Sequence, residues 1–592
     1  MRPQTVRADA DRRTPAFLAV LCLTTFSAFW PVLSNGFVNW DDGANLTGNF
    51  DYRGFGWTQV SWMWTTFHMG HYQPLSWMTL GLDYLVWGLD PFGYHLTSLL
   101  LHGANAVLFY FVALRLLRPA LSAAPGENSN AGPAALFAAL FFAVHPLRVE
   151  SVAWATERRD VVSGFFYLAA ILFYLKACAL PRGRSARRYF RAAAACCLLS
   201  LLSKAIGMTL PFALLLLDVY PLRRLPADPS RWSEPEARAV LREKAPFAAS
   251  ALLFAAVAFL AQKHTGVIAR FSSVGFVERL ELAAFGSAFY LLKTAAPFHL
   301  LPLYARPVHF DPWDPRFTGA LAAVSAIGAG LWLSRRRRPA VAAAGAYYLI
   351  TLSPVLGLVL SGIYLAADRY SYLPCLGWAA LAGAAAGFAH RRLERFGKVA
   401  LIFVLSLVVA GLVFLTNRQC RRWHDSVELW NYTLSIDPQC APAHNNLGTA
   451  LARLGREDEA AAEFSRAIGL DPEYAEAHNN LATAWVHRGK PEEAVAEYRK
   501  ALQALPTYAM ARDNLGAVLA AQGKVAEAIE EYRKALVIDP GDAHAHNNLG
   551  AALAGQGRLD EAAAEFRRAL ALSPHYAEAA DHLRSVFGGK SP

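Results

Sequence analysis

Two adjacent carboxylates, Asp41 and Asp42, follow the first long apolar run of the chain, in the stretch GFVNWDDGANL at residues 36–46. A pair of this kind can transfer protons in an active site, or it can form a solvated turn. The choice between the two depends on where the pair lies in the protein, and therefore on the elements around it.

The chain is more apolar than one soluble core requires, because 55% of its 592 residues are hydrophobic. Stretches close to the roughly 20 residues that cross a bilayer recur from Ala16 to Thr416 and then stop. We therefore predict an all-α protein with a cytoplasmic tail at 1–15, a multispanning membrane domain at 16–417, a junction at 418–440 and a soluble domain after it.

The net charge of +11 comes from basic residues that gather between the apolar stretches, at 2–13, 182–188, 223–244, 335–338 and 391–398. Clusters at such places mark cytoplasmic loops, so the charge does not indicate nucleic-acid binding. Keeping the clusters in the cytoplasm gives about eleven spans, at 16–34, 93–115, 134–147, 161–178, 189–203, 206–221, 246–262, 318–334, 340–360, 371–389 and 399–416.

In this topology residues 35–92 form a large outer loop whose only basic residue is Arg53. The loop is rich in tryptophan and tyrosine, which favour the membrane–water boundary, so we expect its helices to lie against membrane lipids. Segment 279–297 is apolar enough to span, but a span there would misplace the charge clusters, and we predict a re-entrant or interfacial helix. Asp41 and Asp42 consequently lie outside the cytoplasm, at the membrane surface.

Other polar residues fall at the same outer level, where they are costly unless they are paired or used. The stretches HPLRVESVAWATERRD, LLSKAIG and AADRYSYLP supply His145, Glu150, Arg158, Asp160, Lys204, Arg369 and Tyr372. Ordinary alternatives exist, namely helix capping by Glu150 and snorkelling of Lys204 and Arg369 toward water. The convergence of the set on one side of the bilayer favours a site.

From residue 441 the chain repeats with a period of 34. The phrases HNNLG, HNNLA, RDNLG and HNNLG begin at 444, 478, 512 and 546, and one glycine per repeat marks the turn between two helices. This is the tetratricopeptide pattern, in which small residues allow close helix packing and proline ends the second helix. We predict half a repeat before residue 441, then four complete repeats and a capping helix at 441–588.

An asparagine recurs on the first helix of every repeat, at Asn446, Asn480, Asn514 and Asn548. This side normally lines the concave groove, and a primary amide can both donate to and accept from the backbone of an extended peptide. We predict a peptide-binding groove; the alternative is that the amides stiffen the repeats internally. Arg512 and Asp513 break the repeated His-Asn pair, which predicts a groove that is not uniform.

Together, the stretches HPLRVESVAWATERRDVVSG, LLSKAIGMTLP and DRYSYLP, the early WDD and the C-terminal repeats resemble the transmembrane and tetratricopeptide-repeat-containing proteins. The resemblance covers nearly the whole chain. It implies an O-mannosyltransferase of the C-type glycosyltransferase (GT-C) fold, which takes its sugar from a polyprenyl-phosphate carrier and gives it to a serine or threonine hydroxyl of an acceptor protein.

The resemblance also implies roles for the outer residues. In that family an acid just after the first span acts at the reacting centre, which is the place of Asp41 or Asp42. Arg369, Lys204 and Arg158 would stabilise the departing phosphate. The rest of the donor site would consist of His145, Glu150, Asp160 and Tyr372. No ligand spacing in the sequence requires a metal ion or another cofactor.

Because the eleventh predicted span exits outward, we expect the repeats in the periplasm or an equivalent lumen and the N-terminus in the cytoplasm. The alanine- and arginine-rich composition indicates a bacterial source, so we expect the membrane domain in the inner membrane and the repeats in the periplasm. One rival function is a non-catalytic membrane-anchored scaffold that gathers envelope or secreted proteins through the repeats. A second rival transfers sugar to a lipid or a glycan instead of a protein.

Overall fold

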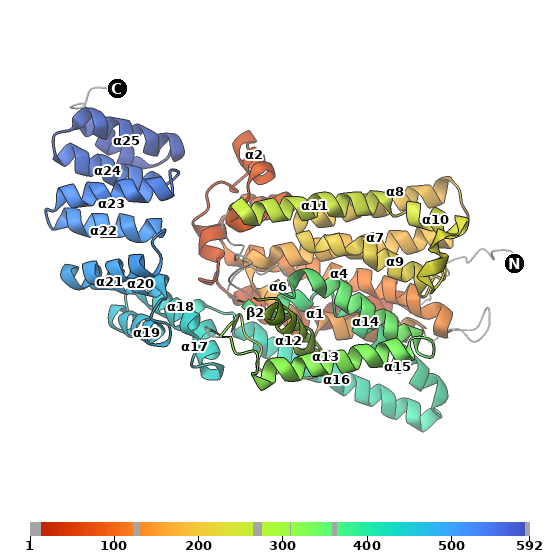
Figure 1. The fold of residues 1–592 in the computed structure, drawn as a ribbon. Coiled ribbons are helices and arrows are strands. Elements are labelled where there is room, and N and C mark those ends of the chain that lie inside the picture. The colour runs from red at the N-terminus through yellow and green to blue at the C-terminus, as the bar shows by residue number, and fades with distance from the viewer. Residues whose placement is uncertain (1–12, 122–130, 265–274, 308–309, 358–363, 587–592) are drawn as a thin grey trace. The chain divides into compact units, whose positions relative to one another are not determined.

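The structure is a computed structural model, and it describes residues 13–121, 131–264, 275–307, 310–357 and 364–586. The chain divides into two compact units, Met1–Leu429 and Trp430–Pro592. Nearly every element is a helix (Figure 1), which confirms the predicted all-α class. The one sheet in the described part of the chain pairs two short antiparallel strands, β1 (Tyr304–Ala305) and β2 (Tyr364–Ala366).

The first unit is a bundle of mostly apolar helices. They are α1 (Thr14–Phe29), α2 (Trp57–Thr65), α3 (Pro74–Trp87), α4 (Pro91–Leu121), α5 (Ala131–Ala143), α6 (Val149–Ala153), α7 (Arg158–Ala179), α8 (Arg184–Ser203), α9 (Leu210–Val219), α10 (Pro235–Arg242), α11 (Ala245–His264), α12 (Phe276–Ala295), α13 (Pro315–Ser334), α14 (Pro339–Leu352), α15 (Leu376–Arg392) and α16 (Arg395–Arg421). The long helices run side by side (Figure 1), with α7 packed against α4 and α8, α5 against α4 and α15, and α16 against α1.

Six helices in the described ranges are long and apolar enough to cross a membrane, or seven if the bent pair formed by α5 and α6 counts as one span. The six comprise α1, α4, α7, α11, α13 and α16. Each of the eleven predicted segments overlaps a helix within the described residues, and the end of segment 340–360, at 358–360, lies outside them. The segments on α5, α8, α9, α14 and α15 are too short or too polar to qualify by themselves. The count of eleven spans therefore stays a prediction, and the predicted re-entrant segment corresponds to α12.

The second unit is a stack of antiparallel helix pairs. After α17 (Ser426–Ile436), within which the boundary between the units falls, come α18 (Ala441–Arg453), α19 (Glu457–Leu470), α20 (Ala475–His487), α21 (Pro491–Ala504), α22 (Ala509–Ala521), α23 (Val525–Ile538), α24 (Ala543–Gly555), α25 (Leu559–Leu572) and α26 (Ala577–Val586). The turn glycines of the four pairs are all left-handed, with φ between 69° and 78°. Only glycine adopts this conformation without strain, which explains its recurrence.

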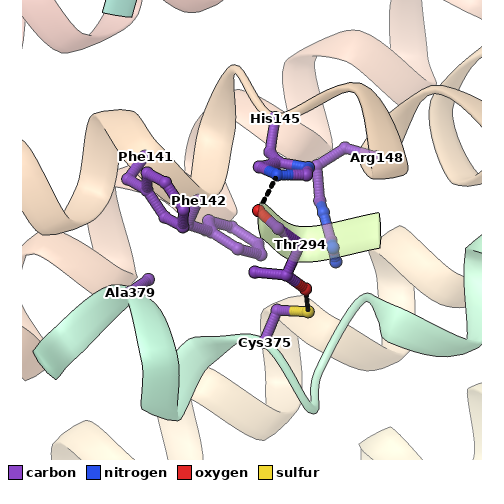
Figure 2. A pocket seen from close by; sticks show the side chains of 7 residues that line it. All are labelled: Phe141, Phe142, His145, Arg148, Thr294, Cys375 and Ala379. Carbon is purple, nitrogen blue, oxygen red and sulfur yellow. Dashed lines mark hydrogen bonds between the residues drawn. The ribbon is translucent and has the colours of Figure 1, made fainter. Parts of the chain in front are cut away.

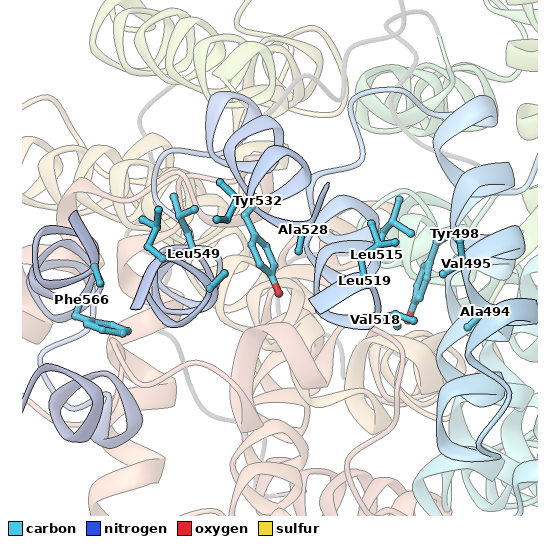
Figure 3. Packing of buried hydrophobic residues seen from close by; sticks show 14 of the residues in the cluster. Ala494, Val495, Tyr498, Leu515, Val518, Leu519, Ala528, Tyr532, Leu549 and Phe566 are labelled. Atoms are coloured by element: carbon cyan, nitrogen blue, oxygen red, sulfur yellow. The ribbon is translucent and has the colours of Figure 1, made fainter. Parts of the chain in front are cut away.

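Aromatic and small residues fill the core between the helix pairs (Figure 3). A Cβ on Gly516 would lie 2.7 Å from Cε1 of Tyr532, so the absence of a side chain lets α22 approach the ring on α23. The same contact recurs between Gly550 and Phe566. The repeat of small residue and aromatic ring predicted from the sequence is therefore the packing unit of this domain.

Candidate active site

The two adjacent carboxylates have different surroundings. Asp42 is 1% exposed, and its carboxylate accepts hydrogen bonds from the backbone of Val38 (3.0 Å) and from the backbone and hydroxyl of Thr156 (3.0 and 2.7 Å). Burial raises the pKa of Asp42 to about 7, although the hydrogen bonds from Thr156 and Val38 lower it. Asp42 therefore fastens its loop to the turn that precedes α7.

Asp41 presents its side chain to a group of cations instead. In the described residues no hydrogen-bond donor contacts its carboxylate, which is partly exposed. Burial raises the pKa of Asp41, and the positive charges of Arg159 and Arg369 oppose that rise. Its backbone is left-handed, with φ 64°, and its carbonyl accepts from the backbone and side-chain amides of Asn45 at 2.9 and 3.1 Å. Of the two acids, Asp41 is the one available for chemistry.

The centre of the cation group is Glu157, whose side chain is fully buried. It accepts from Arg159 in a bidentate pair (3.0 and 2.5 Å), from Lys204 Nζ at 2.9 Å, and it lies 3.2 Å from Nε of Arg369. The three cations come from α7, from the end of α8 and from the turn before α15, so one carboxylate gathers segments that are far apart in the sequence. Lys204 and Arg369, both named from the sequence, meet at this carboxylate.

Two further acids complete the network. Asp160 pairs with Lys204 at 2.7 Å and accepts from the hydroxyl of Ser151 at 3.1 Å. Glu150 forms an ion pair with the guanidinium of Arg369 and accepts from its backbone amide at 2.7 Å. The side chain of Arg369 is 4% exposed, whereas those of Lys204 and Arg159 are 17% and 11% exposed. The last two are thus the cations within reach of a ligand.

Two residues named from the sequence, Arg158 and Tyr372, make their contacts elsewhere. Arg158 is fully buried and pairs with Asp83 at 2.7 Å, so it connects α7 to α3 and does not join the cation group. The hydroxyl of Tyr372 is buried against His102 and Asn105, each at 2.8 Å. Neither residue is free to bind a donor in this arrangement.

His145 faces a cavity of about 10 Å³ (Figure 2), which holds at most one water molecule. Its Nδ1 accepts from the backbone of Leu147 at 3.3 Å, and its Nε2 donates to the carbonyl of Thr294 at 3.1 Å. Both ring nitrogens are therefore used within the protein. His145 holds the bend between α5 and α6 and has no open face toward the cation group.

Glu157, Arg159 and His71 were not predicted from the sequence. Glu157 and Arg159 belong to the stretch TERRD, in which only Arg158 and Asp160 were named as site residues from the sequence. Successive residues of a helix point about 100° apart, so the two arginines face different surroundings. Which of them faces the network depends on where α7 begins, at residue 158. His71 lies beside Arg159, Glu157 and Lys204, and burial lowers its pKa well below the ordinary value, with help from the charge of Arg159. No sequence signal marks His71.

The repeat asparagines contact one another. Asn480 donates to Asn445 of the preceding repeat at 2.9 Å, and Asn514 donates to Asn479 at 3.0 Å. Asn548 donates to both carboxylate oxygens of Asp513, which takes the place of Asn445 and Asn479 in the preceding repeat, at 3.1 and 3.0 Å. The amides therefore connect successive repeats, as the internal alternative expects. They are half-buried, and the groove function stays a prediction.

Comparison with known proteins places these features in context. The C-terminal residues match family models described as "TPR repeat", at 516–557, and "Tetratricopeptide repeat", at 419–475, 446–509 and 543–584. The second unit is a tetratricopeptide-repeat domain. The chain is also similar to the crystal structure of MamA protein, at 28% identity over 26% of this chain and 84% of that one, with a TM-score of 0.23.

The curated relatives are protein O-mannosyl-transferases. Tmtc3 of Drosophila melanogaster is 34% identical over 167 residues, 26% of this chain and 18% of the relative. TMTC4 of Mus musculus is 25% identical over 517 residues, 76% of this chain and 67% of the relative, so that alignment extends through most of the membrane domain. These matches confirm the resemblance seen in the sequence. The chain matches about a fifth of the length of the first relatives, at 18% and 20%.

The tetratricopeptide-repeat domain also explains the irregular third copy. In the first repeat His444 bridges the carboxylate of Glu463 (2.6 Å) and the carbonyl of Pro438 (3.2 Å). Arg512, which replaces this histidine in the third repeat, makes the same two contacts with Glu531 (2.9 Å) and the carbonyl of Pro506 (2.8 Å). The substitution preserves the brace between helices.

Proposed function

We propose that the protein is a membrane glycosyltransferase. It transfers a sugar, mannose by analogy with the relatives, from a polyprenyl-phosphate carrier to a serine or threonine hydroxyl of an acceptor protein. The observation that carries the proposal is the position of Asp41, whose carboxylate meets no hydrogen-bond donor among the described residues, near Arg159 and Arg369 of the cation group around Glu157. The similarity to protein O-mannosyl-transferases supports it.

Asp41 is the proposed general base. As the acceptor hydroxyl forms its bond to the anomeric carbon, the hydroxyl proton passes to the carboxylate, and the bond between that carbon and the carrier phosphate breaks. A raised pKa makes the carboxylate a stronger base, which burial provides here. The phosphate leaves as an anion with the bonding electron pair and needs no proton from the protein.

The departing phosphate requires fixed positive charge. Lys204 and Arg159 supply it, since both are partly exposed and both are held by Glu157. Arg369 is more deeply buried than these two cations and adds its positive charge to theirs. Its guanidinium lies 5.2 Å from the centre of the Trp154 ring. Preorganised charges of this kind cost no rearrangement when the negative charge develops. These cations support a donor whose leaving group is a phosphate, and the proposal takes a polyprenyl-phosphate sugar as that donor.

The tetratricopeptide-repeat domain is proposed to recruit the acceptor. Between repeats, Asn480 and Asn514 each use one donor hydrogen of the side-chain amide, and a primary amide has a second donor and further acceptor capacity for a peptide backbone. Replacing Asn446, Asn480 and Asn548 together by alanine should weaken acceptor binding, measured by fluorescence anisotropy of a labelled peptide.

Both the active site and the repeats are proposed to face the periplasm, with the chain in the bacterial inner membrane.

A transfer assay tests the function. Purified wild-type protein in nanodiscs is incubated with radiolabelled polyprenyl-phosphate mannose, or with nucleotide-linked mannose as a control donor, and with periplasmic extract. The proposal expects labelled protein from the lipid-linked donor only, and no label with Asp41→Asn. If wild type labels nothing while the repeats still bind proteins, the scaffold function replaces the proposal; label in lipid or glycan indicates the second rival.

A further inference from the structure

The loop that carries Asp41 is fastened to the chain segment that leaves the last helix of the bundle. We call residues 420–426, from the last two residues of α16 to the first residue of α17, the connecting segment. Three hydrogen bonds join the loop to it: Asn35 Nδ2 to Cys420 O (3.0 Å), Gly36 N to His424 O (2.8 Å) and Asn39 N to Ser426 Oγ (2.9 Å). All three lie within six residues of Asp41.

A stack of indoles reinforces this connection. Trp423 of the connecting segment stacks on Trp154 with ring centres 6.0 Å apart and planes 28° apart, and Trp154 stacks on Trp40 at 6.2 Å and 30°. Trp40 is the neighbour of Asp41 in the chain, and Trp154 lies two residues before Thr156, which binds Asp42. Trp423 therefore contacts the indole that stacks on Trp40 and lies two residues before Thr156.

The last turns of α16, from which the connecting segment continues, are fixed to the bundle. Thr416 donates to the carbonyl of Val144 at 2.7 Å, and Gln419 donates to the carbonyl of Leu300 at 3.0 Å, both in buried positions. Asp425 caps α17 by accepting from the backbone of Glu428 at 2.9 Å. Since Asp425 serves the cap, the hydroxyl of Ser426 is available to the Asp41 loop.

Asp41 needs such support because of its backbone. A left-handed conformation at a residue other than glycine costs energy and persists only where its surroundings fix it. After Asp41, Asn45 holds its carbonyl; before Asp41, the connecting segment holds residues 35–39. The carboxylate direction depends on both.

We propose that the connecting segment positions Asp41 for proton transfer, with Ser426 and Trp423 as positioning residues. The inference rests on the proposed function and adds a regulatory consequence. The connecting segment continues along the chain into the tetratricopeptide-repeat domain. The part of the chain that orients Asp41 is therefore covalently joined to the domain proposed to bind the acceptor. A change in the segment alters catalytic rate and leaves acceptor affinity unchanged.

The test compares Ser426→Ala with two matched variants of the full-length protein in nanodiscs. Ser426→Thr keeps the hydroxyl, and Ser435→Ala removes a hydroxyl from the same helix that bonds to its own turn, at Tyr432 O. Hydrogen exchange of the peptide covering 35–47 and steady-state transfer kinetics are measured for each. Loss of one hydrogen bond corresponds to about a five-fold change in an equilibrium.

We expect Ser426→Ala to exchange about five-fold faster across 35–47 and to lower kcat about five-fold with an unchanged acceptor KM. Ser426→Thr and Ser435→Ala should behave as wild type. An unchanged kcat, an effect on KM alone, or unaltered exchange overturns the inference. If wild type transfers no sugar, the proposed function fails by itself, and the exchange result alone then decides whether the segment holds the loop.

Discussion

Replacing Asp513 by asparagine should stabilise the tetratricopeptide-repeat domain at neutral pH. The other repeats have an asparagine at this place, and the amide pairs between Asn480 and Asn445 and between Asn514 and Asn479, at 2.9 and 3.0 Å, show that the amide fits. Among the described residues, Asn548 is the hydrogen-bond donor that contacts the Asp513 carboxylate. The neighbouring Arg512 does not pair with Asp513, because it pairs with Glu531. It is a half-buried carboxylate that forms no ion pair within the part of the chain that the structure describes.

The magnitude follows from its pKa. Burial raises the pKa of Asp513 from 3.8 to about 6, against the effect of the hydrogen bond from Asn548. Between about pH 4 and 6 the folded state keeps a proton that the unfolded state has released, so stability falls as pH rises through this window and is constant above it. At about 1.36 kcal/mol per pKa unit the loss is about 3 kcal/mol, an upper value because the group keeps some solvent contact.

The assay is urea unfolding of a fragment containing residues 424–592, followed by circular dichroism at pH 4, 6 and 8. Asp513→Asn should gain up to about 3 kcal/mol at pH 8 and little at pH 4. Glu473→Gln, which neutralises an exposed acid between helices, is the control and should change stability by less than about 0.5 kcal/mol. Equal wild-type stability at pH 4 and 8 would refute the reasoning, as would a variant that gains nothing.

Other contacts lead to further expected outcomes. Glu157→Gln removes the shared partner of three buried cations and should lower the melting temperature, with a cost of roughly 3–5 kcal/mol in differential scanning fluorimetry. Arg159→Gln should lower kcat for transfer about ten-fold or more with a smaller effect on the donor KM, since a charge-assisted contact to the departing phosphate contributes roughly 1.5–3 kcal/mol. Gly516→Ala would place a methyl group 2.7 Å from the Tyr532 ring and cost roughly 1–3 kcal/mol in urea unfolding, whereas Gly469→Ala meets open space and should not destabilise.

The fold was largely predictable because its signals are periodic. The 34-residue repeat fixed every helix pair of the second unit, and the apolar runs fell on helices of the first. The number of spans was less certain, since α8 and α15 carry arginines at one end and α9 has only ten residues. Length and composition do not show whether such helices cross the bilayer or lie within the protein.

The site was predictable only to the level of its segments. The stretches around Asp41, residue 157, Lys204 and Arg369 do meet, because costly polar residues near a membrane must find partners. The sequence could not separate Asp41 from Asp42, since that difference depends on hydrogen bonds from Thr156, 114 residues away. For the same reason it did not reveal that Arg158 is an internal ion pair.

The central claim is that Asp41 acts in catalysis and Asp42 holds the loop. Single-turnover transfer from polyprenyl-phosphate mannose to an acceptor peptide, measured for Asp41→Asn and Asp42→Asn at equal amounts of folded protein, tests it most directly. The account predicts that Asp41→Asn loses roughly 10²–10⁴-fold in rate with an unchanged melting temperature, while Asp42→Asn melts earlier and keeps its rate within about ten-fold. A fully active Asp41→Asn, or loss of the chemical step in Asp42→Asn alone, would contradict it.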